Sequence, residues 1–101
     1  MLGNRPKASQ SRHNGVVKRV AKNLASEGWN VQADVPGYEP PEPIGKTGSV
    51  PDIVASKRGH TRIIEVETPE SLDSDREQRA TFARSAGQKP RTTFETIVTE
   101  D

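Results

Sequence analysis

Three acidic residues are spaced so that their side chains can meet, namely Asp52, Glu65 and Glu67. The segment between Asp52 and Glu65 centres on Arg58-Gly59, which is typical of a turn between two strands. A turn of two or of four residues here makes Asp52 face Glu65, with about 4.5–5.5 Å between their Cβ atoms. Glu67 shares the face of Glu65 because alternate side chains of a strand point the same way. A turn of three or five residues would shift this register.

Carboxylates that face one another repel, so such a cluster needs either raised pKa values or a cation. Hard divalent ions such as Mg²⁺ prefer oxygen ligands and often take only one or two carboxylates together with water. The three acids therefore predict a divalent-metal site on two neighbouring strands.

The remaining sequence predicts the elements that would position this cluster. Helical spacing of Val17, Val20, Ala21 and Leu24 indicates a first helix that ends at Gly28. Apolar groups on both faces of 61–67 indicate a central strand. Ser74 with Glu77 has the pattern of a capping box for a second helix. The expected order is α-β-β-β-α-β, an α/β fold with a mixed central sheet flanked by helices. Its segments are helix 10–27, strands 29–35, 50–56 and 61–67, helix 75–86 and strand 92–99, with a Pro- and Gly-rich loop at 36–48.

Length and composition limit the class of protein. With 101 residues, of which 30% are hydrophobic and none is cysteine, the chain predicts one domain over 10–101 after a disordered tail at 1–9. Disulfides and thiolate metal sites are excluded, and no apolar run suits a membrane helix. A cytoplasmic location is the expectation. The net charge of +1 covers a basic first third and an acidic stretch from Glu65 to Glu77.

The acidic residues also carry a family resemblance. Pro51-Asp52, twelve further residues and then Glu65-Val66-Glu67 resembles the PD-(D/E)xK signature of the restriction-endonuclease-like nucleases, most closely the minimal archaeal Holliday-junction-resolvase-like and RecB-like members. The segment Gln78-Arg79-Ala80-Thr81-Phe82 resembles the Q-x-x-x-Y motif of RecB-like members, with Phe82 in place of tyrosine. The resemblance implies a restriction-endonuclease-like core and a metal-dependent DNA endonuclease.

The resemblance implies a role for each matching residue. Asp52 and Glu65 would bind Mg²⁺ or Mn²⁺, and Gln78 would orient the nucleophile or a ligand. Glu67 stands where the family usually has lysine, and it would serve as a further ligand or as the base that positions water. His13, on the inward face of the first helix, is a partial substitute for the acid that many resolvases carry there. Contacts to DNA phosphates would come from Lys18, Lys22, Lys46, Lys57 and Arg58, and Lys46 or Lys57 is a candidate for the missing cation.

Other functions remain open from the sequence. Glu67 in place of lysine also suits a catalytically inactive nuclease-fold protein that binds nucleic acid or a partner protein. A small accessory domain without a nucleic-acid role is a third possibility. A histidine on an apolar stripe often serves packing alone, and helix lysines often form a solvated face. DNA is the implied partner, and a homodimer is a further possibility because so short a chain gains substrate surface from a second copy.

Overall fold

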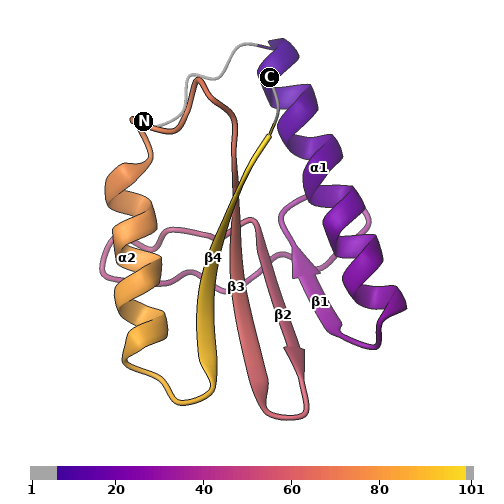
Figure 1. Ribbon diagram of the computed structural model, residues 1–101, viewed down its shortest axis with the longest axis vertical. Coiled ribbons are helices and arrows are strands. Elements are labelled where there is room, and N and C mark those ends of the chain that lie inside the picture. The colour runs from indigo at the N-terminus through magenta and orange to yellow at the C-terminus, as the bar shows by residue number, and fades with distance from the viewer. Residues whose placement is uncertain (1–6, 100–101) are drawn as a thin grey trace.

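Two helices and four strands follow one another in the predicted order in the computed structural model, which describes residues 7–99 (Figure 1). The elements are α1 (Lys7–Ser26), β1 (Asn30–Ala33), β2 (Ile53–Lys57), β3 (His60–Glu67), α2 (Arg76–Gly87) and β4 (Thr92–Val98). Residues 1–6 of the tail that was predicted to be disordered lie outside the described part of the chain. Residues 7–9 belong to the first helix in the structure, because α1 begins at Lys7 and Ser9 is buried.

The four strands form one mixed sheet in the order β1-β2-β3-β4. The first three run antiparallel to one another, and β4 runs parallel to β3 after the α2 crossover. Strand β3 is central, as its two apolar faces predicted. Its α1 side carries Ile64 and Val66, and its α2 side carries Ile63.

The turn between β2 and β3 has the two-residue form. Lys57 pairs with His60, and the ladder continues from there to Ile53 opposite Ile64. Both turn residues have a left-handed backbone, with φ of 52° at Arg58 and 84° at Gly59. Two-residue hairpins favour such a turn because its twist matches that of the strands. The predicted register is therefore confirmed, but the ladder stops one residue before Asp52.

The helices lie on opposite sides of the sheet, and Figure 1 shows α2 to the left and α1 to the right of the four strands. On the α1 side, Val17, Ala21 and Leu24 pack against the buried residues of β1, β2 and β3. On the α2 side the core is smaller and centres on Phe82, which packs against Ile63 and Phe94. The ring centroids of Phe82 and Phe94 are 6.2 Å apart. Neither helix of the described chain has the length and apolar character that a membrane crossing requires.

The start of α2 differs from the predicted capping box. The helix begins at Arg76, its N-cap position is Asp75, and no side chain caps it by a hydrogen bond. The hydroxyl of Ser74 donates instead to the carbonyl oxygen of Ser71 at 3.2 Å. Ser74 thus belongs to the turn that precedes the helix, and the capping-box prediction was wrong.

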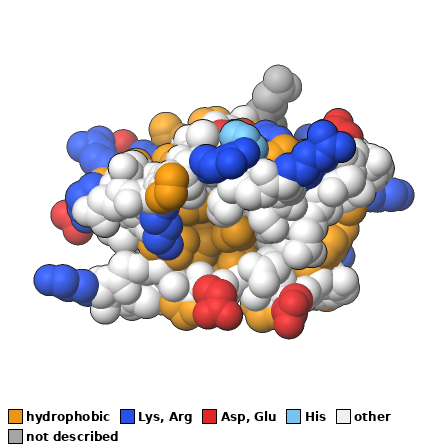
Figure 2. Space-filling model, turned by 90° about the horizontal axis from the view of Figure 1, so that it is seen from below, with side chains coloured by type: hydrophobic (Ala, Val, Ile, Leu, Met, Phe, Trp, Pro, Cys, Tyr) orange, Lys and Arg blue, Asp and Glu red, His pale blue; other side chains and the backbone are white. Residues whose placement is uncertain are grey.

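The Pro- and Gly-rich loop 36–48 crosses the α2 side of the sheet and reaches α2 itself. At Gly45, a Cβ atom would lie 2.6 Å from Cγ2 of Thr81, so only glycine fits this contact. Between this loop and the sheet is a hollow of about 230 Å³, lined in part by Ile44, Val54 and Ile63. Seen from below, the molecule shows hydrophobic side chains at the bottom of a hollow (Figure 2).

Candidate functional site

Asp52 and Glu65 meet where β2 begins and β3 nears its end. Oε2 of Glu65 accepts the backbone N–H of Asp52 at 3.1 Å, and Oδ2 of Asp52 accepts the backbone N–H of Val66 at 2.8 Å. Each carboxyl group thus accepts a hydrogen bond from the backbone of the segment that carries the other. The predicted pair is brought together, but through these reciprocal bonds and not as a cross-strand pair within the ladder.

His13 of α1 completes this group. Its Nε2 lies 3.1 Å from Oδ2 of Asp52, and its Nδ1 lies 3.0 Å from Oδ1 of Asn14. The imidazole is almost fully buried, because it lies on the apolar stripe that faces the sheet. We call His13, Asp52 and Glu65 the acidic site. It draws one side chain from α1, one from the entry to β2 and one from β3.

The pKa of Glu65 is raised to about 10. Burial is the main cause, since only 3% of the residue is exposed, and the charge of Asp52 adds to the rise. The hydrogen bond from the backbone of Asp52 acts in the opposite direction. Near neutral pH, Glu65 therefore holds a proton unless a cation takes its place.

The stability of the metal-free protein should therefore depend on pH. Folded Glu65 keeps its proton up to about pH 10, whereas the unfolded chain loses it near the ordinary value of 4.5. Between these values the unfolded state binds fewer protons, so the free energy of unfolding falls as pH rises, by about 1.4 kcal/mol per pH unit. We expect urea unfolding in EDTA to have a lower midpoint at about pH 8 than at about pH 5.

Glu65→Gln should remove this part of the pH dependence, because the amide does not titrate. The free energy of unfolding of both proteins should be measured across the same pH range. An unchanged pH slope in the variant would show that Glu65 does not hold the proton assigned to it.

Glu67 is fully buried and is bound by the turn and helix that follow β3. Its Oε1 accepts the hydroxyl hydrogen of Ser71 at 2.6 Å, and its Oε2 lies 3.3 Å from Nη1 of Arg79. Burial raises the pKa of Glu67 and nearby Asp75 raises it further, whereas Ser71 and Arg79 oppose the rise. Glu67 thus fastens α2 and the turn before it to the sheet.

Ser71 and Arg79 were not predicted as partners of Glu67. Arg79 stands directly after Gln78 in the segment that carries the family resemblance, and that was the only signal for it. Gln78 itself is half-buried in the first turn of α2. The cation near Glu67 is therefore Arg79 of α2.

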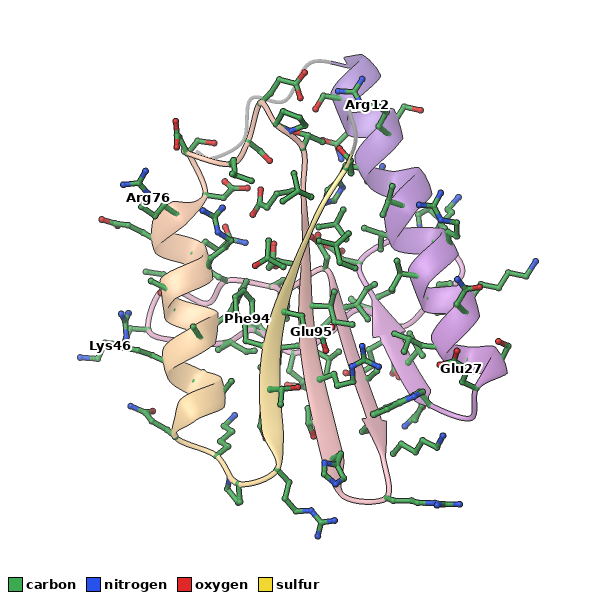
Figure 3. All side chains as sticks on the ribbon, in the orientation of Figure 1. Arg12, Glu27, Lys46, Arg76, Phe94 and Glu95 are labelled. Atoms are coloured by element: carbon green, nitrogen blue, oxygen red, sulfur yellow. The ribbon has the colours of Figure 1, made fainter. Side chains whose placement is uncertain are left out.

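The lysines that were candidates for that cation lie elsewhere. Nζ of Lys57 donates to the carbonyl oxygen of Glu27 at 2.7 Å and lies 5.6 Å from the centre of the Trp29 ring. Lys57 is thus at the turn end of β2, and Asp52 is at the other. Lys46 lies beyond the outer side of α2, where its loop contacts that helix (Figure 3). The proposal that either lysine stands in the site was wrong.

The other predicted phosphate contacts are spread over the surface. Lys18 and Lys22 are exposed on α1, and Arg58 is exposed in the β2–β3 turn. Arg62 of β3 pairs with Glu95 through two bonds of 2.7 and 3.0 Å. The predicted basic residues therefore do not surround the acidic site, and their contact with DNA stays a prediction.

The donor atoms of the acidic site are of types that suit a metal ion, but their positions do not form a ready coordination geometry. Within residues 7–99, no group of three or more His, Cys, Asp or Glu side chains is arranged to hold a metal ion. The donor set is nevertheless one that divalent ions accept, with two carboxylates and an imidazole. The side chain of Asp52 is 14% exposed, so solvent reaches part of this carboxyl group. Metal binding here would require the carboxylates to adjust.

Comparison of the chain with protein-family models and with curated proteins found no match. The function inferred below therefore rests on the order of the elements, the mixed sheet and the acidic site.

Proposed function

We propose that the chain is a metal-dependent phosphodiesterase that acts on DNA and has a restriction-endonuclease-like core. One observation carries the proposal: two carboxyl groups from adjoining strands meet at the end of the sheet, and one of them is buried at the cost of a strongly raised pKa. A divalent cation would replace the proton on Glu65 and remove that cost. The element order and the hairpin register support the resemblance from which DNA is taken as the substrate.

Each residue of the acidic site has a distinct part in this proposal. Asp52 and Glu65 would hold the ion, since hard cations prefer carboxylate oxygen. Such an ion lowers the pKa of bound water and neutralises charge on a phosphate. His13 contacts Asp52 from α1 and so orients that carboxylate. Glu67 supports the site from outside, because Ser71 and Arg79 already engage both of its oxygens.

The proposal is tested by metal binding and cleavage measured on the same preparation. Mg²⁺ or Mn²⁺ is titrated while the backbone amides of Asp52 and Val66 are followed by NMR, because both donate to the carboxyl groups of the site. Linear, branched and single-stranded DNA are then incubated with and without the metal. Binding at these amides together with metal-dependent cleavage is the expected result, and failure of the amides to respond to either metal would contradict it.

One observation favours a non-catalytic protein as the second candidate. Glu67 stands where the family usually has lysine, and in the described chain this buried carboxyl group is held in an ion pair with Arg79 of α2. A protein of this kind would bind metal and DNA without cutting. Intact metal binding with no cleavage of any of the three DNA forms would select this candidate over the first.

A further inference from the structure

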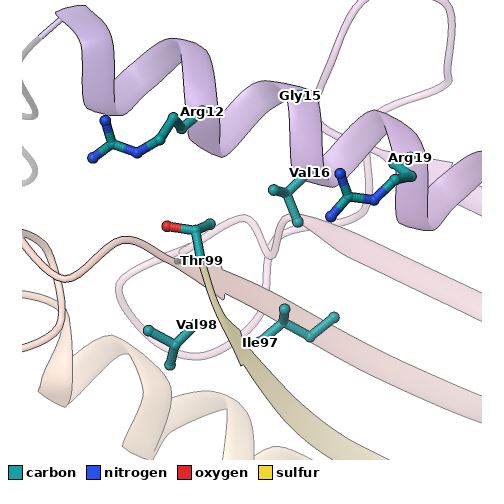
Figure 4. A pocket seen from close by; sticks show the side chains of 7 residues that line it. All are labelled: Arg12, Gly15, Val16, Arg19, Ile97, Val98 and Thr99. Carbon is teal, nitrogen blue, oxygen red and sulfur yellow. The ribbon is translucent and has the colours of Figure 1, made fainter. Parts of the chain in front are cut away.

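A groove runs between α1 and the end of β4, on the side of the sheet that faces α1 (Figure 4). Its volume is about 630 Å³. Arg12, Gly15 and Arg19 line it from α1, and Ile97 and Thr99 line it from the strand and the residue that follows. None of the lining residues is acidic, but Glu70 pairs with Arg12 from outside the lining, so the unbalanced positive charge of the groove is that of Arg19. Val16, Ile97 and Val98 give the groove its apolar surface.

Two polar atoms in this groove lack a partner within the described chain. Thr99 is only 8% exposed, and its Oγ1 is buried without a hydrogen bond. Nε of Arg12 is likewise buried and makes no hydrogen bond, although Nη2 of the same guanidinium is bound by both oxygens of Glu70 at 3.2 Å. Buried donors that are left unpaired cost free energy. An acceptor in the groove would recover that cost.

The arrangement of these donors suits a phosphate. Glu70 holds the Arg12 guanidinium in place, and Arg19 adds a positive charge on the same face of α1, about two turns further along the helix. Gly15 between them would have no atom within 4 Å of a Cβ, so the helix surface there is open to a ligand. Guanidinium and hydroxyl groups are the usual donors to phosphate oxygens, and Ile97 offers apolar surface to a sugar.

Two backbone links connect the groove with the acidic site. Arg12 precedes His13, whose imidazole contacts Asp52. Ile97 pairs with Val66 in the parallel β3–β4 ladder, and the N–H of Val66 is bound by Asp52. We infer that the groove binds the sugar-phosphate backbone of a DNA strand and leads it past Asp52 and Glu65. The inference rests on the proposed function for the identity of the polymer.

The test measures DNA binding in EDTA, where no metal-dependent step takes part. The anisotropy of a fluorescein-labelled duplex and of its single strand is followed for the wild type, Arg19→Gln, Thr99→Val and Arg76→Gln. Arg76 serves as the matched control, because it is an exposed arginine at the start of α2 and lies outside the groove. Thr99→Val should not weaken the fold, since the hydroxyl it removes has no partner in the described chain.

Arg19→Gln and Thr99→Val are expected to lower affinity by about tenfold or more, the scale of one hydrogen bond to a charged group. Arg19→Gln should also reduce the slope of log affinity against log salt by about one. Arg76→Gln should leave affinity within about twofold. Groove variants that bind as Arg76→Gln does would overturn the inference, and so would polyglutamate that competes with DNA as well as unlabelled DNA does.

The two proposals can fail separately in this design. If the groove variants lose DNA affinity and the wild type never cleaves, the groove assignment stands and the phosphodiesterase falls. If the wild type cleaves with metal and the groove variants keep full affinity, only the groove assignment falls. A wild type that does not bind DNA even at low salt overturns both.

Discussion

Glu65→Gln should reduce metal-dependent DNA cleavage by about 100-fold or more, because loss of an outer-shell partner alone costs about 10–100-fold and Glu65 is proposed to hold the ion itself. The amide keeps the size of the carboxyl group and can still accept the N–H of Asp52, but it brings no charge to a cation. The folded protein already holds Glu65 in its neutral form at neutral pH, so the substitution should leave the fold intact. Cleavage under single-turnover conditions and metal affinity by calorimetry are the measurements.

Glu95→Gln is the matched control for this prediction. Glu95 lies on β4 opposite Ile64 and pairs with Arg62, so the same chemical change is made in the same sheet away from the acidic site. Cleavage by this variant should stay within about threefold of the wild type, because a half-exposed ion pair contributes little. Equal cleavage by the Glu65 variant and the wild type would remove Glu65 from the site.

Phe82→Ala should lower the free energy of unfolding by about 3–5 kcal/mol. That is a large share of the total of about 5–15 kcal/mol that is typical of a domain. Phe82 is the largest fully buried side chain of the described chain, and it lies in the small core between α2 and the sheet. The cavity it would leave is bounded by Phe94 and by the backbone of α2, which cannot collapse fully. Urea unfolding followed by far-UV circular dichroism measures the loss.

Phe82→Leu provides the comparison, since it keeps an apolar side chain in the same place. We expect it to lose clearly less stability than Phe82→Ala. A loss of about 0.5 kcal/mol or less for the alanine variant, the usual size for an exposed position, would contradict the packing assigned to Phe82. The presence of Phe82 at the tyrosine position of the Q-x-x-x-Y motif would then need an explanation other than core packing.

Local patterns in the sequence predicted the elements and the hairpin register. Gly59 after Arg58 indicates a tight turn, and once that turn is set the pairing of β2 with β3 follows residue by residue. Apolar residues on both faces of β3 indicate a central strand, because each apolar face has to be covered by other parts of the fold. The closeness of Asp52 and Glu65 needed only this one hairpin, which is why the sequence could predict it.

The features that the sequence did not predict depend on contacts between distant segments. The orientation of Glu67 is set by Ser71 and Arg79, and thus by the course of an irregular turn. The groove depends on how closely α1 approaches β4, elements that are far apart in the chain. The position of Lys46 depends on where a long loop crosses the sheet. None of these three features produces a periodic pattern in the sequence.

The β2–β3 hairpin also implies an order in which the site assembles. Asp52 and Glu65 are 13 residues apart, whereas Asp52 and His13 are 39 apart. Hairpins form in about 1–10 μs, and contacts between more distant residues close more slowly. We therefore expect the two carboxyl groups to come together while water still surrounds them. The two carboxyl groups can acquire the proton or cation that neutralises them at that stage, before α1 packs against the sheet and His13 contacts Asp52.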